Sequence, residues 1–290
     1  LRGQRRVVGA TDLGAQFGAT DFQLGPGDLA AAFRHLHPRA ALAAQLQRLG
    51  DADAGLAIAL AGVLDAPGQI RVGDQPGLLP RAAGGEVEAQ KCVRILTPLI
   101  KFRACRDARR VTGDAMEVRG GVGYIEEWSD PRLVRDAHLG SIWEGTSNIV
   151  ALDVARAVSR EQALEPLQRH LRRLLDDSDL PGDARDLFDE LLVRVVATMA
   201  DVAERRQDEQ VRQAGSALYH LCTAIFMAWE ASRQAPDQRR LALAFLVARH
   251  KLLPRDPLHL EGWTDQAELL ARVVGEVPLS QAEAMQLLPA

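Results

Sequence analysis

"TPLIKFRACRDARRVTGDAMEVRGG", residues 97–121, is the stretch that decides the fold. Apolar side chains return in it at steps of three and four, at Leu99, Phe102, Cys105 (or Ala104), Ala108, Val111, Ala115 and Val118. This period is typical of an amphipathic helix with one buried face. Thr97 suits an N-cap, Pro98 suits the first helical position, and Gly120–Gly121 suit a left-handed C-terminal cap. The sequence therefore predicts a helix that begins at Pro98 and ends before Gly120.

The sequence on both sides of this helix also favours helices. Ala and Leu dominate the 290 residues, aromatic residues make up only 4%, and alternating runs of β-branched residues are nearly absent. Amphipathic helices are expected over 183–207, 214–233, 238–253 and 265–275, the first with a seam at Phe188, Leu192, Val195, Met199 and Val202. Residues 66–86 hold three prolines and several glycines, which predicts a loop or insertion. We expect an all-α fold, with a four-helix-type up-down bundle over 1–158 and a second helical bundle over 159–290.

Charge and hydropathy exclude several classes of partner. The formal net charge is −4, and residues 151–290 alone carry 17 basic and 22 acidic side chains. Because nucleic-acid binding depends on cationic side chains that replace counterions, a nucleic-acid partner is not expected. The longest apolar run, residues 214–229, is shorter than the roughly 20 residues that a bilayer span needs. It also contains His220, so a buried helix is expected there and no membrane association.

The cysteines indicate a protein of a reducing compartment, and neither the cysteines nor the histidines indicate a metal centre. Cys92, Cys105 and Cys222 lie far apart within apolar runs, as buried free thiols do. His35 and His37 have no cysteine or carboxylate at ligand spacing, so no metal site is expected. The chain starts at Leu1 without a charged-then-apolar leader. We therefore expect a cytoplasmic protein, and the first residue suggests a fragment of a longer one.

Glu144 is the residue whose setting points to chemistry. It lies between the apolar pair Ile142–Trp143 and a Gly-Thr-Ser turn that leads into a helix beginning near Thr146 or Ser147. A base that abstracts a weakly acidic C–H proton needs a carboxyl whose pKa is raised by desolvation, and an apolar wall supplies it. The helix N-terminus that follows is suited to an anion or phosphate. The alternative interpretation is a helix-terminal charge that interacts with the dipole.

The upstream stretch "GGVGY", residues 120–124, also has two interpretations. A dinucleotide fingerprint would need a third glycine where Glu126 stands, and a preceding strand instead of a helix. A helix C-cap with a tight turn is the simpler interpretation.

Taken together, "GGVGYIEEWSDPRLVRDAHLGSIWEGTSNI" (residues 120–149) resembles the C-terminal helical domain of the acyl-CoA dehydrogenase family. That family has a Gly-Gly-x-Gly-Tyr turn, about ten residues to an Arg-Asp, and then a Tyr- or Trp-Glu-Gly-Thr/Ser segment. The order and spacing agree over residues 115–158. The Trp and the Asn-Ile ending are most similar to the alkylation-response (adaptive) flavoprotein branch. The family's N-terminal helical domain and middle β domain have no counterpart in this sequence.

The resemblance implies an FAD-dependent oxidoreductase of fatty acid metabolism that acts on acyl-CoA thioesters. Glu144 would remove the proton alpha to the thioester while hydride passes to flavin N5. In a homodimer or homotetramer, Gly120, Gly121 and Tyr124 would approach the FAD of a neighbouring subunit, and Thr146 and Asn148 the FAD of their own. Arg5 and Gln16, in "RRVVGATDLGAQ" (residues 5–16), match a flavin-contact segment of the family. An electron-transfer protein would be the acceptor.

Three alternatives stay open at this point. One is an alkylation-response-type flavoprotein that binds DNA, although the acidic C-terminal half argues against that role. Another is a non-catalytic helical oligomerisation module. The third is a related flavin enzyme, such as a nitroalkane oxidase or a flavin-dependent monooxygenase. Because the two missing domains would cover the substrate, the isolated chain is expected to bind FAD poorly and to turn over little.

Overall fold

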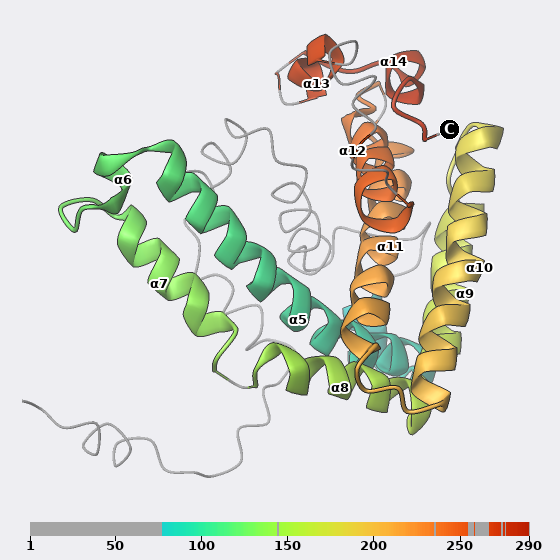
Figure 1. Ribbon diagram of the computed structural model, residues 1–290. Coiled ribbons are helices and arrows are strands. Elements are labelled where there is room, and N and C mark those ends of the chain that lie inside the picture. Colours follow the sequence, from blue (N-terminus) through green and yellow to red (C-terminus); the bar gives the residue numbers. More distant parts are fainter. Residues whose placement is uncertain are drawn as a thin grey trace, which may run out of the picture. The chain divides into compact units, whose positions relative to one another are not determined.

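The all-α prediction is confirmed for the part of the chain that the computed structural model describes, residues 77–143, 145–234, 236–254, 258, 267–273, 275 and 277–289. No strand occurs among these residues. The helices, shown in Figure 1, are α4 (Leu78–Ala83), α5 (Val87–Val118), α6 (Gly121–Tyr124), α7 (Asp130–Gly140), α8 (Ser147–Ser159), α9 (Leu164–Asp176), α10 (Gly182–Glu204), α11 (Val211–Ala231), α12 (Arg239–Val247), the π-helix η1 (Ala248–Leu252), α13 (Ala267–Val273) and α14 (Gln281–Met285). The predicted bundle over 1–158 depends largely on residues outside the described ones, and the boundary at 158–159 stays a prediction.

Helix α5 begins earlier than predicted because its apolar stripe continues toward the N-terminus beyond Pro98. Buried side chains recur at helical spacing from Ala89 to Phe102. The predicted start at Pro98 was wrong, since α5 begins at Val87 and Pro98 lies inside it. Thr97 is not an N-cap, because its hydroxyl donates to the carbonyl of Val93 (2.8 Å) within the helix. Burial of the whole stripe outweighs the hydrogen bond that a proline removes from a helix interior.

The C-terminal end of α5 lies where the sequence predicted it. The helix ends at Val118, and Gly120 has the positive φ (+59°) that favours glycine. The buried stripe, however, ends before the helix does: Val111 is buried, whereas Val118 is exposed. The last turns of α5 therefore present apolar side chains to solvent.

Two further expectations were wrong in part. Residues 78–83 of the predicted 66–86 loop form α4, and residues 66–76 lie outside the described residues. The connector expected between the Gly120 turn and the Thr146 helix contains the 11-residue helix α7, with Pro131 in its first turn. Pro in the first helical turn is compatible with a helix, because its missing N–H has no intrahelical partner there. The predicted start of the next helix is confirmed, since α8 begins at Ser147.

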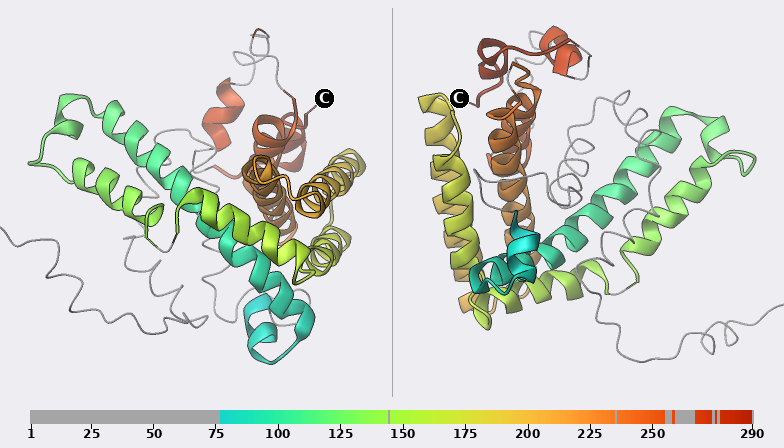
Figure 2. Two further views of the ribbon diagram at one scale, coloured as in Figure 1. Left: turned by 60° about the horizontal axis from the view of Figure 1, so that its bottom comes forward. Right: turned by 180° about the vertical axis from the view of Figure 1, so that it is seen from behind.

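The core centres on α11, which packs against α5, α8, α9, α10 and α12. Figures 1 and 2 show α11 beside α9 and α10, with α8 crossing near their ends. Sixteen of the 21 residues of α11 are buried, so the helix is covered on all sides. The predicted seam of α10 is confirmed: its five apolar residues are all buried, and the ring of Phe188 stacks on Phe245 at 5.9 Å.

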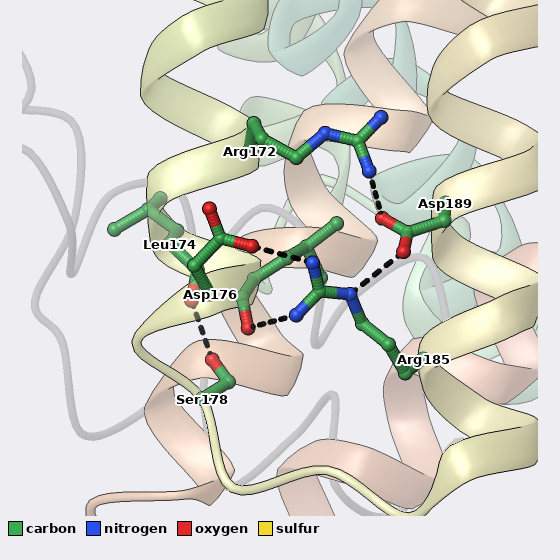
Figure 3. Close-up of polar contacts among 7 residues, drawn as sticks. Arg172, Leu174, Asp176, Ser178, Arg185 and Asp189 are labelled. Atoms are coloured by element: carbon green, nitrogen blue, oxygen red, sulfur yellow. Dashed lines mark hydrogen bonds and ion pairs between the residues drawn. The ribbon is translucent and has the colours of Figure 1, made fainter.

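A polar cluster joins α9 to α10 at their common end (Figure 3). Arg185 donates to the carbonyl of Leu175 (2.9 Å), to Asp176 (2.5 Å) and to Asp189 (2.8 Å). Arg172 donates to the same Asp189 carboxylate. One guanidinium thus satisfies a helix-terminal carbonyl of α9 and holds α10 beside it.

The cysteines match their prediction closely. All three are free, Cys92 and Cys222 are buried, and Cys105 is half-buried. Burial raises the pKa of the Cys92 thiol to about 12, so it stays protonated at neutral pH. No group of three or more metal-ligating side chains occurs among the described residues, and none of the helices described there could cross a membrane. His35 and His37 lie outside the described residues.

Candidate functional site

The Gly120 turn is built by a close approach of α6 to the end of α5. Gly123 is buried, and a Cβ placed on it would lie 2.3 Å from the carbonyl oxygen of Met116. Gly121, in contrast, has open space around its Cβ position. In "GGVGY", therefore, Gly120 is required by its positive φ and Gly123 by the lack of space for a side chain. Neither requirement applies to Gly121. Tyr124 is exposed.

An ion pair between an exposed arginine and a buried carboxylate fixes this turn against the start of α7. Asp130 is buried, and its carboxylate lies 3.2 Å from Nε of Arg119. The same guanidinium lies over the ring of Trp128, 5.6 Å from its centroid. The segment between α6 and α7 is thus held to Arg119, the C-cap residue of α5, although Trp128 itself stays exposed.

Two side chains of α5 hold the segment that precedes Glu144. Arg109 donates to Oγ of Ser141 (3.2 Å), and Nζ of Lys101 donates to the carbonyl of Trp143 (2.8 Å). Sequence reasoning missed both residues. Their signal was the spacing of 101, 105 and 109, which places Lys101, Cys105 and Arg109 on one face of the helix. On that face Cys105 also meets α7, since a Cβ on Gly140 would lie 3.1 Å from its Sγ.

The apolar wall expected beside Glu144 is not shielded from water by the described part of this chain. The side chains of Ile142 and Trp143 are 66% and 64% exposed. Glu144 itself lies outside the described residues, as do Arg5 and Gln16. Desolvation of a carboxyl at position 144 would therefore need a cover from another segment or another chain.

The start of α8 carries exposed polar side chains beside the N–H groups of its first turn. Gly145 has a φ of +114°, a conformation that L side chains rarely adopt, and Thr146 is the N-cap. The Thr146 side chain makes no cap hydrogen bond, and both Thr146 and Asn148 are exposed. Two polar side chains therefore face solvent at the N-terminus of a 13-residue helix, an arrangement that suits an anionic group.

The predicted site residues fall into two groups at opposite ends of α7. Gly120, Gly121 and Tyr124 lie beside its first turn, and Thr146 and Asn148 follow its last (Figure 1). Eleven helical residues span about 16 Å. One chain therefore presents two half-sites and does not bring these residues into a single cleft.

The surface around both half-sites is unusually apolar. Exposed large apolar side chains in this region are Val118, Val122, Tyr124, Ile125, Trp128, Leu139, Ile142, Trp143 and Ile149. Clusters of this kind mark surfaces that another protein segment or a ligand covers.

Comparison with known proteins identifies this part of the chain. Residues 77–159 match the family described as acyl-CoA dehydrogenase, C-terminal domain. AidB of Escherichia coli (strain K12) is 40% identical over 91 residues, which are 31% of this chain and 17% of AidB. Acyl-CoA dehydrogenase family member 11 of Caenorhabditis elegans is 36% identical over 103 residues, which are 35% of this chain and 16% of that protein.

The likeness in fold extends further than the likeness in sequence. The crystal structure of Caenorhabditis elegans ACDH-11 in complex with C11-CoA superposes with a TM-score of 0.58 at 21% identity, over 71% of this chain and 35% of that one. Because 71% of this chain is more residues than 1–159 contain, the superposed part includes helices beyond α8. The chain matches about a sixth of the length of the two sequence relatives. Over residues 77–159 the chain is therefore similar to the C-terminal domain of the acyl-CoA dehydrogenase family.

Proposed function

We propose that the chain forms part of an FAD-dependent oxidoreductase that dehydrogenates acyl-CoA thioesters, with Glu144 as the catalytic base. The observation that carries the proposal is the double anchoring of the segment before Glu144, by Lys101 at the Trp143 carbonyl and by Arg109 at Ser141. A base must be held within hydrogen-bond reach of the proton that it removes, and these contacts fix the backbone that leads to it.

The residues of the two half-sites suit FAD. The first-turn N–H groups of α8, with Thr146 and Asn148, are donors of the kind that hold a pyrophosphate. Gly121 leaves open space in which a ring system can approach the backbone of a neighbouring subunit. Arg5 and Gln16 would add contacts from the N-terminal segment. When bound, FAD supplies an acceptor for hydride from the beta carbon of the acyl chain.

In this proposal Glu144 removes the proton from the carbon alpha to the thioester. Lys101 and Arg109 are positioning residues, since each bonds to the segment and neither needs to touch substrate. Ile142 and Trp143 become the apolar wall only when a second subunit or a further domain covers them, because they are exposed in the single chain. A homodimer or homotetramer is therefore part of the proposal, and an electron-transfer protein would reoxidise the flavin.

Replacing Glu144 by Gln in the FAD-loaded protein tests the assignment. The rate at which an acyl-CoA reduces the flavin under anaerobic conditions, followed at the flavin absorbance band, should fall by at least 100-fold. The bound flavin content should stay unchanged. The matched control is Glu126→Gln, an exposed carboxylate paired with Arg135 on the same domain. Unchanged flavin reduction in Glu144→Gln would place the base elsewhere. By itself, the 290-residue chain should bind FAD weakly and show little turnover.

A second candidate function is a non-catalytic oligomerisation module, and the exposed apolar side chains between Val118 and Ile149 favour it. In that case the chain would self-associate without FAD, and Trp143→Ser would dissociate it. Sedimentation velocity with and without FAD separates the two proposals, because the first expects FAD to promote association.

A further inference from the structure

A cationic pocket lies on α5, α7 and η1, and of its lining residues the proposed dehydrogenation uses only Arg109, through its bond to Ser141. Its volume is about 360 Å³. The lining side chains are Arg103, Arg106, Asp107, Arg109, Arg110, His138 and Lys251. The four arginines come from two turns of α5, where positions three and four apart share one side of the helix.

The pocket carries a surplus of positive charge. Five of its lining side chains are cations and one is a carboxylate, which belongs to Asp107. Asp107 is buried and accepts a 2.6 Å hydrogen bond from Arg103. Burial lowers the pKa of Arg106, and the neighbouring Arg212, Arg103 and Arg109 lower it further. The charged form of Arg106 is therefore disfavoured by its surroundings in the unliganded protein.

The pocket also holds unused donors. Nε of Arg103 and Nε of Arg109 are buried and have no hydrogen-bond acceptor among the described residues. Buried charged donors without an acceptor are rare, because a buried donor that makes no hydrogen bond costs free energy. His138 uses Nδ1 to donate to the carbonyl of Val134 (2.7 Å), which leaves Nε2 available to a ligand.

We propose that this pocket binds a small polyphosphate, that is, a ligand with two or more linked phosphate groups such as a nucleotide diphosphate. Guanidinium groups in a row match the paired oxygens of such an anion. The volume is in the range of small-molecule sites. Duplex nucleic acid, in contrast, needs a long cationic face, and residues 151–290 have more acidic than basic side chains.

Isothermal titration of the 290-residue chain with inorganic pyrophosphate tests the proposal. Saturable binding to one site is expected, and Arg106→Gln should weaken it at least tenfold, since a charge-assisted contact to phosphate is lost. Arg194→Gln is the matched control, because Arg194 is an exposed arginine of α10 paired with Glu190. Arg110→Gln, at an exposed position of the pocket, gives a second variant that should also weaken binding.

Thermal unfolding separates binding from a structural role. Without ligand, Arg106→Gln should melt at or above the wild-type temperature, because one of several mutually repelling charges is gone; with pyrophosphate, its stabilisation should be lost. ADP and coenzyme A, titrated in parallel, distinguish a free nucleotide from the nucleotide part of a coenzyme as the source of the phosphates. No pyrophosphate binding, equal binding in Arg106→Gln, or binding of duplex DNA alone would overturn the proposal. None of these outcomes depends on Glu144.

Discussion

Replacing Gly123 by alanine should destabilise the protein through a single methyl group. Gly123 and Gly121 belong to the same four-residue helix, α6, yet their surroundings differ. A Cβ at position 123 would meet the Met116 carbonyl oxygen at 2.3 Å and Cβ of Arg119 at 2.9 Å, whereas a Cβ at position 121 would meet nothing within 4 Å.

The magnitude follows from what stands in the way. Non-bonded heavy atoms prefer about 3.5 Å, so α6 has to move off α5 by roughly 1 Å. The Met116 oxygen belongs to helical backbone and cannot turn aside as a side chain could. Overpacking costs about 1–3 kcal/mol, and a backbone obstacle places Gly123→Ala at the upper end, about 3 kcal/mol. That corresponds to a fall in Tm of roughly 5 °C.

Thermal unfolding followed by circular dichroism at 222 nm provides the measurement, with Gly121→Ala as the control. Alanine at 121 should leave Tm unchanged or raise it slightly, since alanine favours helix more than glycine does. If both variants melt within 1 °C of each other, the packing argument for Gly123 is refuted. In the FAD-loaded protein the order should invert for flavin affinity, because Gly121 is the glycine proposed to face the flavin.

Three further predictions concern the helices around α11. Phe188→Ala should cost about 3–5 kcal/mol, because its fully buried ring stacks on another; urea unfolding checks this against Val193→Ala, an exposed position on the same helix where almost no change is expected. Burial, with nearby arginines, lowers the pKa of His170 to about 4, so the unfolded state binds this proton first as pH falls. Stability should therefore decline between pH 6.5 and 4, by up to about 3 kcal/mol, and His170→Gln should flatten that part of the curve; an unchanged slope would contradict it. Arg185→Gln should lower stability by about 1–3 kcal/mol by leaving the Asp176 carboxylate and the Leu175 carbonyl without their donor, and an unaltered urea midpoint would show that water replaces it.

The sequence was most informative where one helix face is buried along its whole length. The five apolar residues of α10 from Phe188 to Val202 are all buried, as their spacing predicted. The start of α8 was also predictable, because Gly145 and Thr146 are residue types that serve a helix entrance. In both places local preference and tertiary packing agree.

The prediction failed where packing overrides a local signal. Thr97 and Pro98 look like a helix start, but the buried residues before them, such as Cys92 and Ile95, extend α5 through the proline. The role of Gly123 could not be read from the motif either, because it depends on Met116, seven residues earlier, after the chain has turned.

The candidate site was predictable in its residue types but not in its arrangement. The family match to residues 77–159 agrees with the resemblance read from order and spacing, and the roles of Glu144, Thr146 and Asn148 stay a prediction. That Ile142 and Trp143 would be exposed could not be deduced, since an apolar pair looks the same in sequence whether its own chain or a partner covers it.

The all-round burial of α11 has a consequence for how this protein could have evolved. The match to the family's domain ends at residue 159, yet α5 and α8, which precede that residue, pack directly against α11, which follows it. A chain that ended at residue 159 would expose to water the apolar faces of α5 and α8 that α11 covers in this structure. Replacing the helices after residue 159 would therefore require matching changes in α5 and α8, so we expect the two parts to fold as one unit.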